Sequence, residues 1–161
     1  MKKWICLLLS LVAVPLMAQS ANNYAMPKDV YDALVYVHKT GTGYMENLSA
    51  ADKQILAPVK GLIFVQFGAG FCRPCGYMIT DLEERGWMTR WKENGVRFFK
   101  IDTEKDLEQG GERLTSLWEV DRMPFLVALK DGKKVWSNIG YSSSSQSFFN
   151  KISELTETYK K

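Results

Sequence analysis

The chain has 161 residues, 46% hydrophobic and 24% charged, which is enough for one folded domain with a sizeable core. Its formal net charge is +3, and Lys2 and Lys3 at the N-terminus supply two of those charges. Without those two, 19 of the 21 basic residues remain against 18 acidic ones, a net charge of +1. That balance gives no electrostatic reason to expect binding to nucleic acid or to an anionic membrane.

Residues 1–18 have the pattern of a secretory signal peptide. A cationic start, Met1–Lys3, precedes an apolar run from Trp4 to Leu16, and Ala18 supplies a small residue for cleavage. An uncleaved membrane anchor is the alternative, but the run is too short to span a bilayer comfortably. We therefore expect residues 1–18 to be removed from an exported protein, which would be periplasmic in an organism with an outer membrane. No later stretch is long and apolar enough for a transmembrane helix.

Residues 19–58 are expected to form a helical N-terminal extension. Pro27–Lys39 predicts a helix, because proline fits the first helical position and apolar residues then recur at helical spacing. Ser49–Asp52 has the form of a capping box, which predicts a short helix to about Ala57. Pro58 then ends that helix.

Residues 59–161 are expected to form one α/β domain. Short apolar runs rich in β-formers predict strands, and longer runs with helical periodicity predict helices. An Asp-Gly pair predicts a tight hairpin turn between the last two strands. The strands are expected at 62–67, 96–101, 125–129 and 135–139, and the helices at 72–93 (with a break near Gly86), at 107–118 and after the serine run 142–145.

The order of these elements is βαβ, a helix, a β-hairpin and a final helix. A βαβ unit implies parallel strands joined by a crossover helix, whereas a hairpin adds an antiparallel pair. The sequence therefore predicts a central mixed β-sheet with helices on both faces.

The sequence holds three cysteines, and Cys6 leaves with the signal peptide. The two that remain, Cys72 and Cys75, are separated by two residues. A disulfide closing so small a loop constrains the unfolded chain less than a long-range one, so a purely stabilising role is weakly motivated. We interpret the pair as reactive.

The run Cys72-Arg73-Pro74-Cys75 falls where a buried strand ends and a helix begins. Unpaired N–H groups at a helix N-terminus favour an anion, and the cationic Arg73 acts in the same direction, so a thiolate at Cys72 is favoured. Pro74 suits the first helical turn. We expect Cys72 to be the exposed nucleophile and Cys75 the more buried resolving thiol.

A second element, Met123-Pro124, precedes the third strand. A proline at this point is a candidate for a cis peptide bond, which would turn the backbone of Met123 toward Cys72 and an extended substrate. A trans proline that starts the strand is the alternative, and spacing alone does not decide between them.

From Gly61 to the C-terminus, about two-thirds of the chain, the sequence resembles thioredoxin-like proteins. The resemblance rests on the order of the first strand, the Cys72–Cys75 motif, the strand that ends at Asp102, Met123-Pro124 and the Lys130–Lys133 turn. It implies a thioredoxin-like fold and an oxidoreductase that exchanges thiols and disulfides without a cofactor.

The same resemblance implies roles for individual residues. Cys72 and Cys75 correspond to the redox-active pair, and Pro124 corresponds to the cis-proline of the family. Met123 and Pro124 would contact substrate, together with Phe71 and Arg73 beside the nucleophile. Phe71 stands where a tryptophan is usual, and with Trp118 it is a candidate for an apolar surface that contacts other chains.

Two departures from the family pattern concern proton transfer and redox balance. Gln66 stands where many thioredoxins carry a buried aspartate, and Phe98 where they carry its companion lysine. Glu83 and Glu84 are candidates for replacing that aspartate through water. Because the thiolate is favoured, we expect the pair to be less reducing than a cytosolic thioredoxin, whose potential is about −270 mV.

Metal binding has little support in the sequence. The exported chain has no further cysteine and only His38, so four Cys or His ligands for zinc are not available within one chain. Copper(I) held by the two thiolates, with Met78 or Met123 as a soft neighbour, is an alternative. We expect His38 to be a partly buried structural residue.

The leading hypothesis is an enzyme that exchanges disulfides with cysteine-containing proteins of the cell envelope and is served by a membrane redox partner. The sequence does not decide whether this enzyme acts as a reductase, an isomerase or an oxidase. A redox-inert or copper(I)-handling binding module is the alternative. We expect a monomer with no bound metal.

Overall fold

The structure is a computed structural model that describes residues 24–105 and 114–160. The signal peptide predicted for residues 1–18 lies outside the described residues, as does the first part of the helix predicted at 107–118.

The N-terminal helices form where the sequence predicts them. Helix α1 spans Lys28–Thr40 with Pro27 as its N-cap, and α2 spans Ala50–Leu56. The Ser49 side chain caps α2 by accepting a hydrogen bond from the backbone N–H of Asp52 at 3.1 Å. A 3₁₀ turn, η3 (Ala57–Val59), follows and leads into the sheet.

The sheet has four strands in the order β2-β1-β3-β4. Strand β1 pairs in parallel with β2 and antiparallel with β3, and β3 pairs antiparallel with β4. Asp131 and Gly132 form the hairpin turn with φ angles of 53° and 83°, the left-handed region that an Asp-Gly turn adopts. The strands are β1 (Leu62–Gly68), β2 (Arg97–Asp102), β3 (Phe125–Lys130) and β4 (Lys133–Ile139).

The helix predicted at 72–93 is two helices. Gly86, with a φ of 74°, separates α3 (Arg73–Glu84) from α4 (Trp87–Glu93), so the expected break is real. In the described part of the segment predicted at 107–118, a short helix α5 covers Leu114–Leu117. The last helix, α6 (Gln146–Tyr159), begins after Ser145, whose hydroxyl accepts from the backbone N–H of Phe148.

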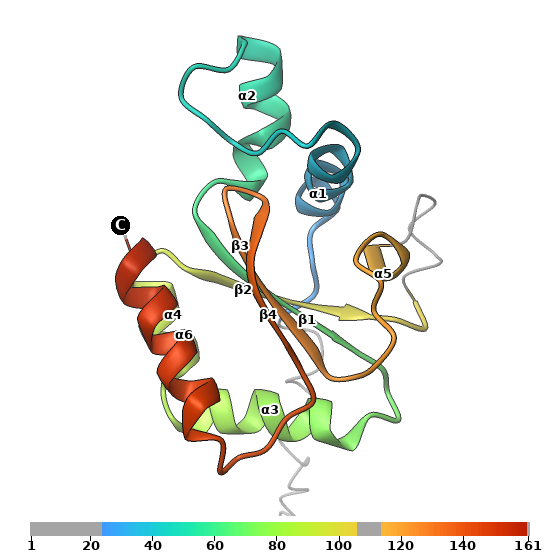
Figure 1. Cartoon of the computed structure of the whole chain (residues 1–161), viewed down its shortest axis with the longest axis vertical. Coiled ribbons are helices and arrows are strands. Elements are labelled where there is room, and N and C mark those ends of the chain that lie inside the picture. The colour runs from blue at the N-terminus through green and yellow to red at the C-terminus, as the bar shows by residue number, and fades with distance from the viewer. Residues whose placement is uncertain (1–23, 106–113, 161) are drawn as a thin grey trace, which may run out of the picture.

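The helices lie on both faces of the sheet, which confirms the predicted architecture (Figure 1). Helices α1 and α5 cover one face, where they share a core with Ile63, Val65 and Phe67 of β1. Helices α3, α4 and α6 cover the other face over Leu62 and Phe64. The first helix is therefore part of the core of the sheet, while α2 projects from one end of the molecule (Figure 1).

Strand β1 is buried along its whole length, so its side chains alternate between the two cores. One member of this strand is polar: Gln66 lies in line with Leu62 and Phe64 and is fully buried. Thr156 of α6 is the other fully buried polar residue among those that the structure describes.

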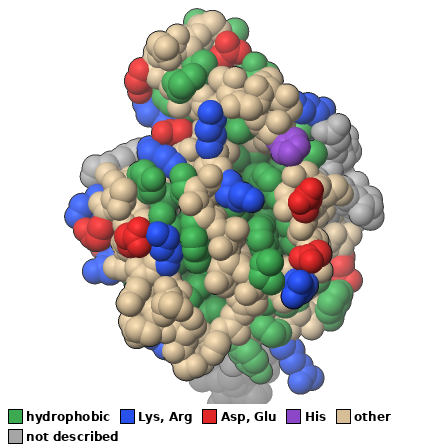
Figure 2. Space-filling view, in the orientation of Figure 1, with side chains coloured by type: hydrophobic (Ala, Val, Ile, Leu, Met, Phe, Trp, Pro, Cys, Tyr) green, Lys and Arg blue, Asp and Glu red, His purple; other side chains and the backbone are tan. Residues whose placement is uncertain are grey.

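Charges of both signs are interspersed on the face shown in Figure 2, so this face carries no basic patch. His38, the only histidine of the sequence, lies at the surface of α1 and is exposed, so the expectation of a partly buried structural histidine was wrong. It directly follows Val37, the last buried position of α1, and faces away from the core. No helix within residues 24–105 and 114–160 is long and apolar enough to cross a membrane.

Candidate functional site

Three chain segments meet at the end of β1. Gly68, its last residue, is in parallel register with Asp102 of β2, and its neighbour Phe67 is opposite Phe125 of β3. The backbone N–H of Thr103 donates to the Gly68 carbonyl at 2.8 Å. The loop after β1, the loop after β2 and the segment before β3 therefore lie at one edge of the sheet.

The cysteine motif occupies the first of these segments. Cys72 is the N-cap of α3, which begins at Arg73, and Pro74 sits in the first turn, where its missing N–H costs no helical hydrogen bond. The backbone N–H of Cys72 donates to Ala69 at 3.0 Å, and that of Cys75 donates to Cys72 at 3.0 Å. The motif is therefore held at a helix N-terminus by its own backbone.

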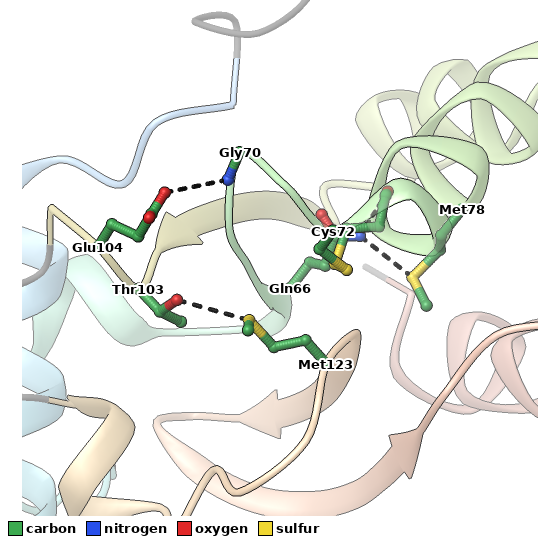
Figure 3. Close-up of a disulfide and its surroundings, with 8 residues drawn as sticks. Gln66, Gly70, Cys72, Met78, Thr103, Glu104 and Met123 are labelled. Atoms are coloured by element: carbon green, nitrogen blue, oxygen red, sulfur yellow. Dashed lines mark hydrogen bonds between the residues drawn. A yellow bond between two sulfur atoms is a disulfide. The ribbon is translucent and has the colours of Figure 1, made fainter.

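Cys72 and Cys75 are joined by a disulfide (Figure 3). Cys72 is partly exposed, whereas Cys75 is only 2% exposed, so Cys72 is the more accessible of the two cysteines. A Cβ atom added at Gly68 would lie 3.0 Å from the Sγ and 3.1 Å from the Cβ of Cys75. Glycine at this position therefore leaves the space that the buried cysteine fills.

Gln66 lies beneath the motif. Its Nε2 donates to the backbone carbonyl of Cys75 at 2.9 Å and lies 3.6 Å from the Met78 sulfur (Figure 3). Its Oε1 is buried and has no hydrogen-bond partner among the described residues. Phe98, the other departure from the family pattern, is buried in the apolar core on the same face of the sheet.

The segment before β3 supplies Met123 and Pro124, and the peptide bond between them is cis. Pro124 is buried, and its carbonyl accepts from the backbone N–H of Gly140 at 2.8 Å. The Met123 sulfur lies 3.5 Å from the Thr103 hydroxyl (Figure 3). This segment is therefore held by residues that follow β2 and β4.

Two residues of the site have no signal in the sequence. Thr103 contacts Met123, and the Glu104 carboxylate accepts from the backbone N–H of Gly70 at 3.4 Å (Figure 3). Both follow β2, and only the parallel pairing of β2 with β1 brings them beside the motif. Because these contacts depend on the pairing of two strands, the sequence around Thr103 and Glu104 shows no motif that predicts them.

Apolar side chains at this edge are exposed. Phe71 is 71% exposed, Tyr77 is 63% exposed and Ile139, which pairs with Phe125 next to Pro124, is 53% exposed. Arg73 is also exposed. Trp118, the other aromatic expected beside Phe71, is partly buried and packs edge-on against Phe67, with ring centroids 5.4 Å apart.

The far half of α3 is anchored by two tyrosines from distant segments. The Tyr24 hydroxyl donates to Glu83 at 2.7 Å, and the Tyr141 hydroxyl donates to Asp81. Glu83 lies eight residues beyond Cys75, which at 1.5 Å per residue is about 12 Å along the helix axis. Its carboxylate is bonded to Tyr24, and the proton transfer suggested for Glu83 and Glu84 stays a prediction.

The pKa values of both tyrosines are raised. Partial burial, followed by the hydrogen bond to Glu83 and its charge, raises the pKa of Tyr24 to about 12. Burial, and then the hydrogen bond to Asp81 and its charge, raise the pKa of Tyr141. A pKa that is higher in the folded state contributes stability below the unfolded value of about 10, and this contribution is lost as the pH rises through the folded value.

We therefore expect the free energy of unfolding to fall between pH 10 and about pH 12. The double variant Tyr24→Phe, Tyr141→Phe should be less stable at pH 8 by about 0.5 kcal/mol per lost hydrogen bond. It should also lose less stability than the wild type over the alkaline range. Urea denaturation across this pH series measures both effects, and parallel curves for the two proteins would contradict the assignment.

No group of three or more Cys, His, Asp or Glu side chains in residues 24–105 and 114–160 is arranged to hold a metal ion.

Comparison with solved structures places this fold among thioredoxins. The germline-specific thioredoxin Deadhead of Drosophila melanogaster is 26% identical, with a TM-score of 0.50, over 65% of this chain and 90% of that one. The thioredoxin of Malassezia sympodialis is 20% identical, with a TM-score of 0.50, over 65% of this chain and 87% of that one. The thioredoxin of Fasciola hepatica is 29% identical over 65% of this chain and 92% of that one, with a TM-score of 0.49.

No protein-family model matches the chain, and no curated protein matches it. The structural likeness covers about two-thirds of this chain and most of each thioredoxin. The fold of the chain is thioredoxin-like.

Proposed function

We propose that this protein exchanges thiols and disulfides with cysteine-containing proteins of the cell envelope, with Cys72 as nucleophile and Cys75 as resolving thiol. One observation carries the proposal: a disulfide at the start of α3 joins a partly exposed cysteine to a buried one. In a thioredoxin-like fold this arrangement lets a substrate sulfur reach the first cysteine while the second stays shielded.

The exchange proceeds in two balanced steps. In the reduced protein the Cys72 thiolate attacks one sulfur of a substrate disulfide, forms a mixed disulfide and releases the first substrate thiolate, which takes up a proton. Cys75 then loses its proton and attacks the Cys72 Sγ. This restores the Cys72–Cys75 disulfide, releases the second substrate thiolate and leaves the substrate reduced by two electrons. The same two steps in reverse oxidise a substrate dithiol and reduce the Cys72–Cys75 disulfide.

The substrate would bind over the edge of the sheet where the three segments meet. The backbone of Met123, next to Pro124, would pair with an extended substrate chain, and the exposed Phe71 would contact its apolar side chains. Arg73 would favour the thiolate of Cys72 and attract acidic groups. An extended, partly unfolded polypeptide fits such a rim better than a compact small molecule does.

The proposed place of action rests on the N-terminal sequence. The signal-peptide pattern of residues 1–18 supports export, with the periplasm as the compartment in an organism that has an outer membrane. There a membrane redox partner would return the pair to its working state, and the protein would act as a monomer.

The test uses residues 19–161 in two assays, reduction of insulin with dithiothreitol as electron source and refolding of a protein with scrambled disulfides. We expect the wild type to accelerate at least one of these and Cys72→Ser to fall to the uncatalysed rate, because no other partly exposed thiol remains. Matching circular dichroism of the two proteins controls for folding. Equal rates for wild type and Cys72→Ser in both assays would overturn the proposal.

A further inference from the structure

We propose that Gln66 tunes the redox pair: in the reduced protein its Oε1 accepts a hydrogen bond from the Cys75 thiol, which favours the dithiol over the disulfide. This inference rests on the proposed function of Cys72 and Cys75 and adds a residue that sets their redox balance.

The first argument is the unpaired amide oxygen. Gln66 is fully buried, and its Oε1 has no partner among the described residues while the disulfide is present. The orientation of the amide follows from chemistry, because the Cys75 carbonyl only accepts hydrogen bonds and so must face the Nε2 at 2.9 Å. A buried oxygen without a donor costs free energy, and native structures rarely keep one without a reason.

The second argument is the place of the Cys75 sulfur. Side chains at every second position of a strand share a face, so position 68 follows Gln66 on the same face of β1. A Cβ at Gly68 would lie 3.0 Å from the Cys75 Sγ, which places the sulfur directly over that position. The Gln66 Nε2 already bonds to the backbone of Cys75. The Cys75 thiol is therefore the group beside Gln66 that gains a proton when the disulfide is reduced.

Few charged groups belong to the elements that pack against Gln66. Leu126, its register partner on β3, is apolar, and Lys100, its partner on β2, is partly exposed. On α3 the charged residues lie at the exposed start or toward the far end of the helix: Arg73, Asp81, Glu83 and Glu84. The amide itself is neutral at all working pH values.

The hydrogen bond acts on one redox state. A disulfide has no proton to donate, whereas the Cys75 thiol has one, so the bond to Oε1 stabilises the reduced form selectively. Stabilising the reduced form makes the pair more oxidising. An amide does not remove the proton, so when Cys75 attacks Cys72 the proton passes to water or to the departing substrate thiolate.

The test is the equilibrium of the pair with glutathione in the wild type, Gln66→Met and Gln66→Glu. Methionine fills a similar volume without an amide, so we expect its pair to become about fivefold harder to reduce, about 20 mV more negative. A protonated glutamate keeps both an acceptor and a donor, so Gln66→Glu should match the wild type at low pH. Once that carboxyl ionises it should add an inflection to the plot of potential against pH, which the wild type lacks.

Thr156→Val is the matched control, because it removes a buried hydrogen bond between α6 and Trp91 and leaves the motif untouched. It should lower the free energy of unfolding without moving the potential. The proposal is overturned if Gln66→Met keeps the wild-type potential, or if Gln66→Glu shows no added inflection. If Gln66→Met does not fold, the added inflection in Gln66→Glu decides the test by itself. A wild type that does not exchange with glutathione at all would overturn the proposed function instead.

Discussion

Cys75→Ser is expected to leave the protein covalently joined to its substrates. Cys72 remains partly exposed at the start of α3, so it still attacks a substrate disulfide. The second step fails because serine supplies no sulfur to attack the mixed disulfide. Turnover should therefore stop after one event, with the substrate bound through the Cys72 sulfur.

The measurement is non-reducing electrophoresis and mass spectrometry of Cys75→Ser recovered from envelope extracts. We expect adducts that dithiothreitol releases and whose linked peptide contains Cys72. The double variant Cys72→Ser, Cys75→Ser is the matched control, since it lacks the nucleophile and is expected to keep the fold. Adducts of equal abundance in the double variant would show that capture does not proceed through Cys72.

The reduced state of the substrate protein is a further readout. If substrate linked to Cys75→Ser carries one new free thiol for each adduct, then the attacked bond was a substrate disulfide. Substrates identified in this way would also show whether the protein acts on folded or extended chains, which bears on the exposed rim formed by Phe71 and Ile139.

Trp91→Ala is expected to cause the largest loss of stability among single core substitutions, about 4 kcal/mol. Trp91 is 1% exposed and stacks on Phe64 with ring centroids 4.4 Å apart. Its ring also lies 5.8 Å from that of Phe98, and its Nε1 donates to the Thr156 hydroxyl at 2.9 Å. Removing it leaves a cavity between α4, α6 and the sheet that neighbouring rings do not fill.

Equilibrium denaturation in urea measures this loss through the midpoint and slope of the transition. The stability of Trp91→Phe should lie between those of the wild type and Trp91→Ala, because phenylalanine keeps a stacked ring but loses the hydrogen bond to Thr156. Trp136→Ala on the edge strand β4 is the control, since that side chain is only partly buried and should cost less. Equal losses for Trp91→Ala and Trp136→Ala would show that this face does not form a packed core.

Local patterns account for most of the elements. The capping serine of α2, the apolar run of β1 and the Asp-Gly turn each depend on residues within a few positions of one another, so the sequence shows them directly. Gly86 likewise indicated the break between α3 and α4. The end of one helix at Glu84 and the start of the next at Trp87 follow from the φ of 74° at that glycine.

The cysteine motif itself was also visible in the sequence, because reactivity at a helix start depends on residue types in a row. Its surroundings were not. Thr103 and Met123 are 20 residues apart and touch only because the end of β2 and the start of β3 flank the end of β1. His38 shows the reverse error: helical spacing alone suggested partial burial, and packing leaves it exposed.

By itself the sequence determined the strands, the helix starts, the hairpin and the reactive pair, since each results from interactions along the chain. The tertiary structure decided what surrounds the pair. Sheet register brings Gly68 under the Cys75 sulfur and sets Gln66 below the Cys75 backbone with its Oε1 unpaired. Contacts between distant segments depend on strand pairing and helix packing, and no short stretch of sequence records them.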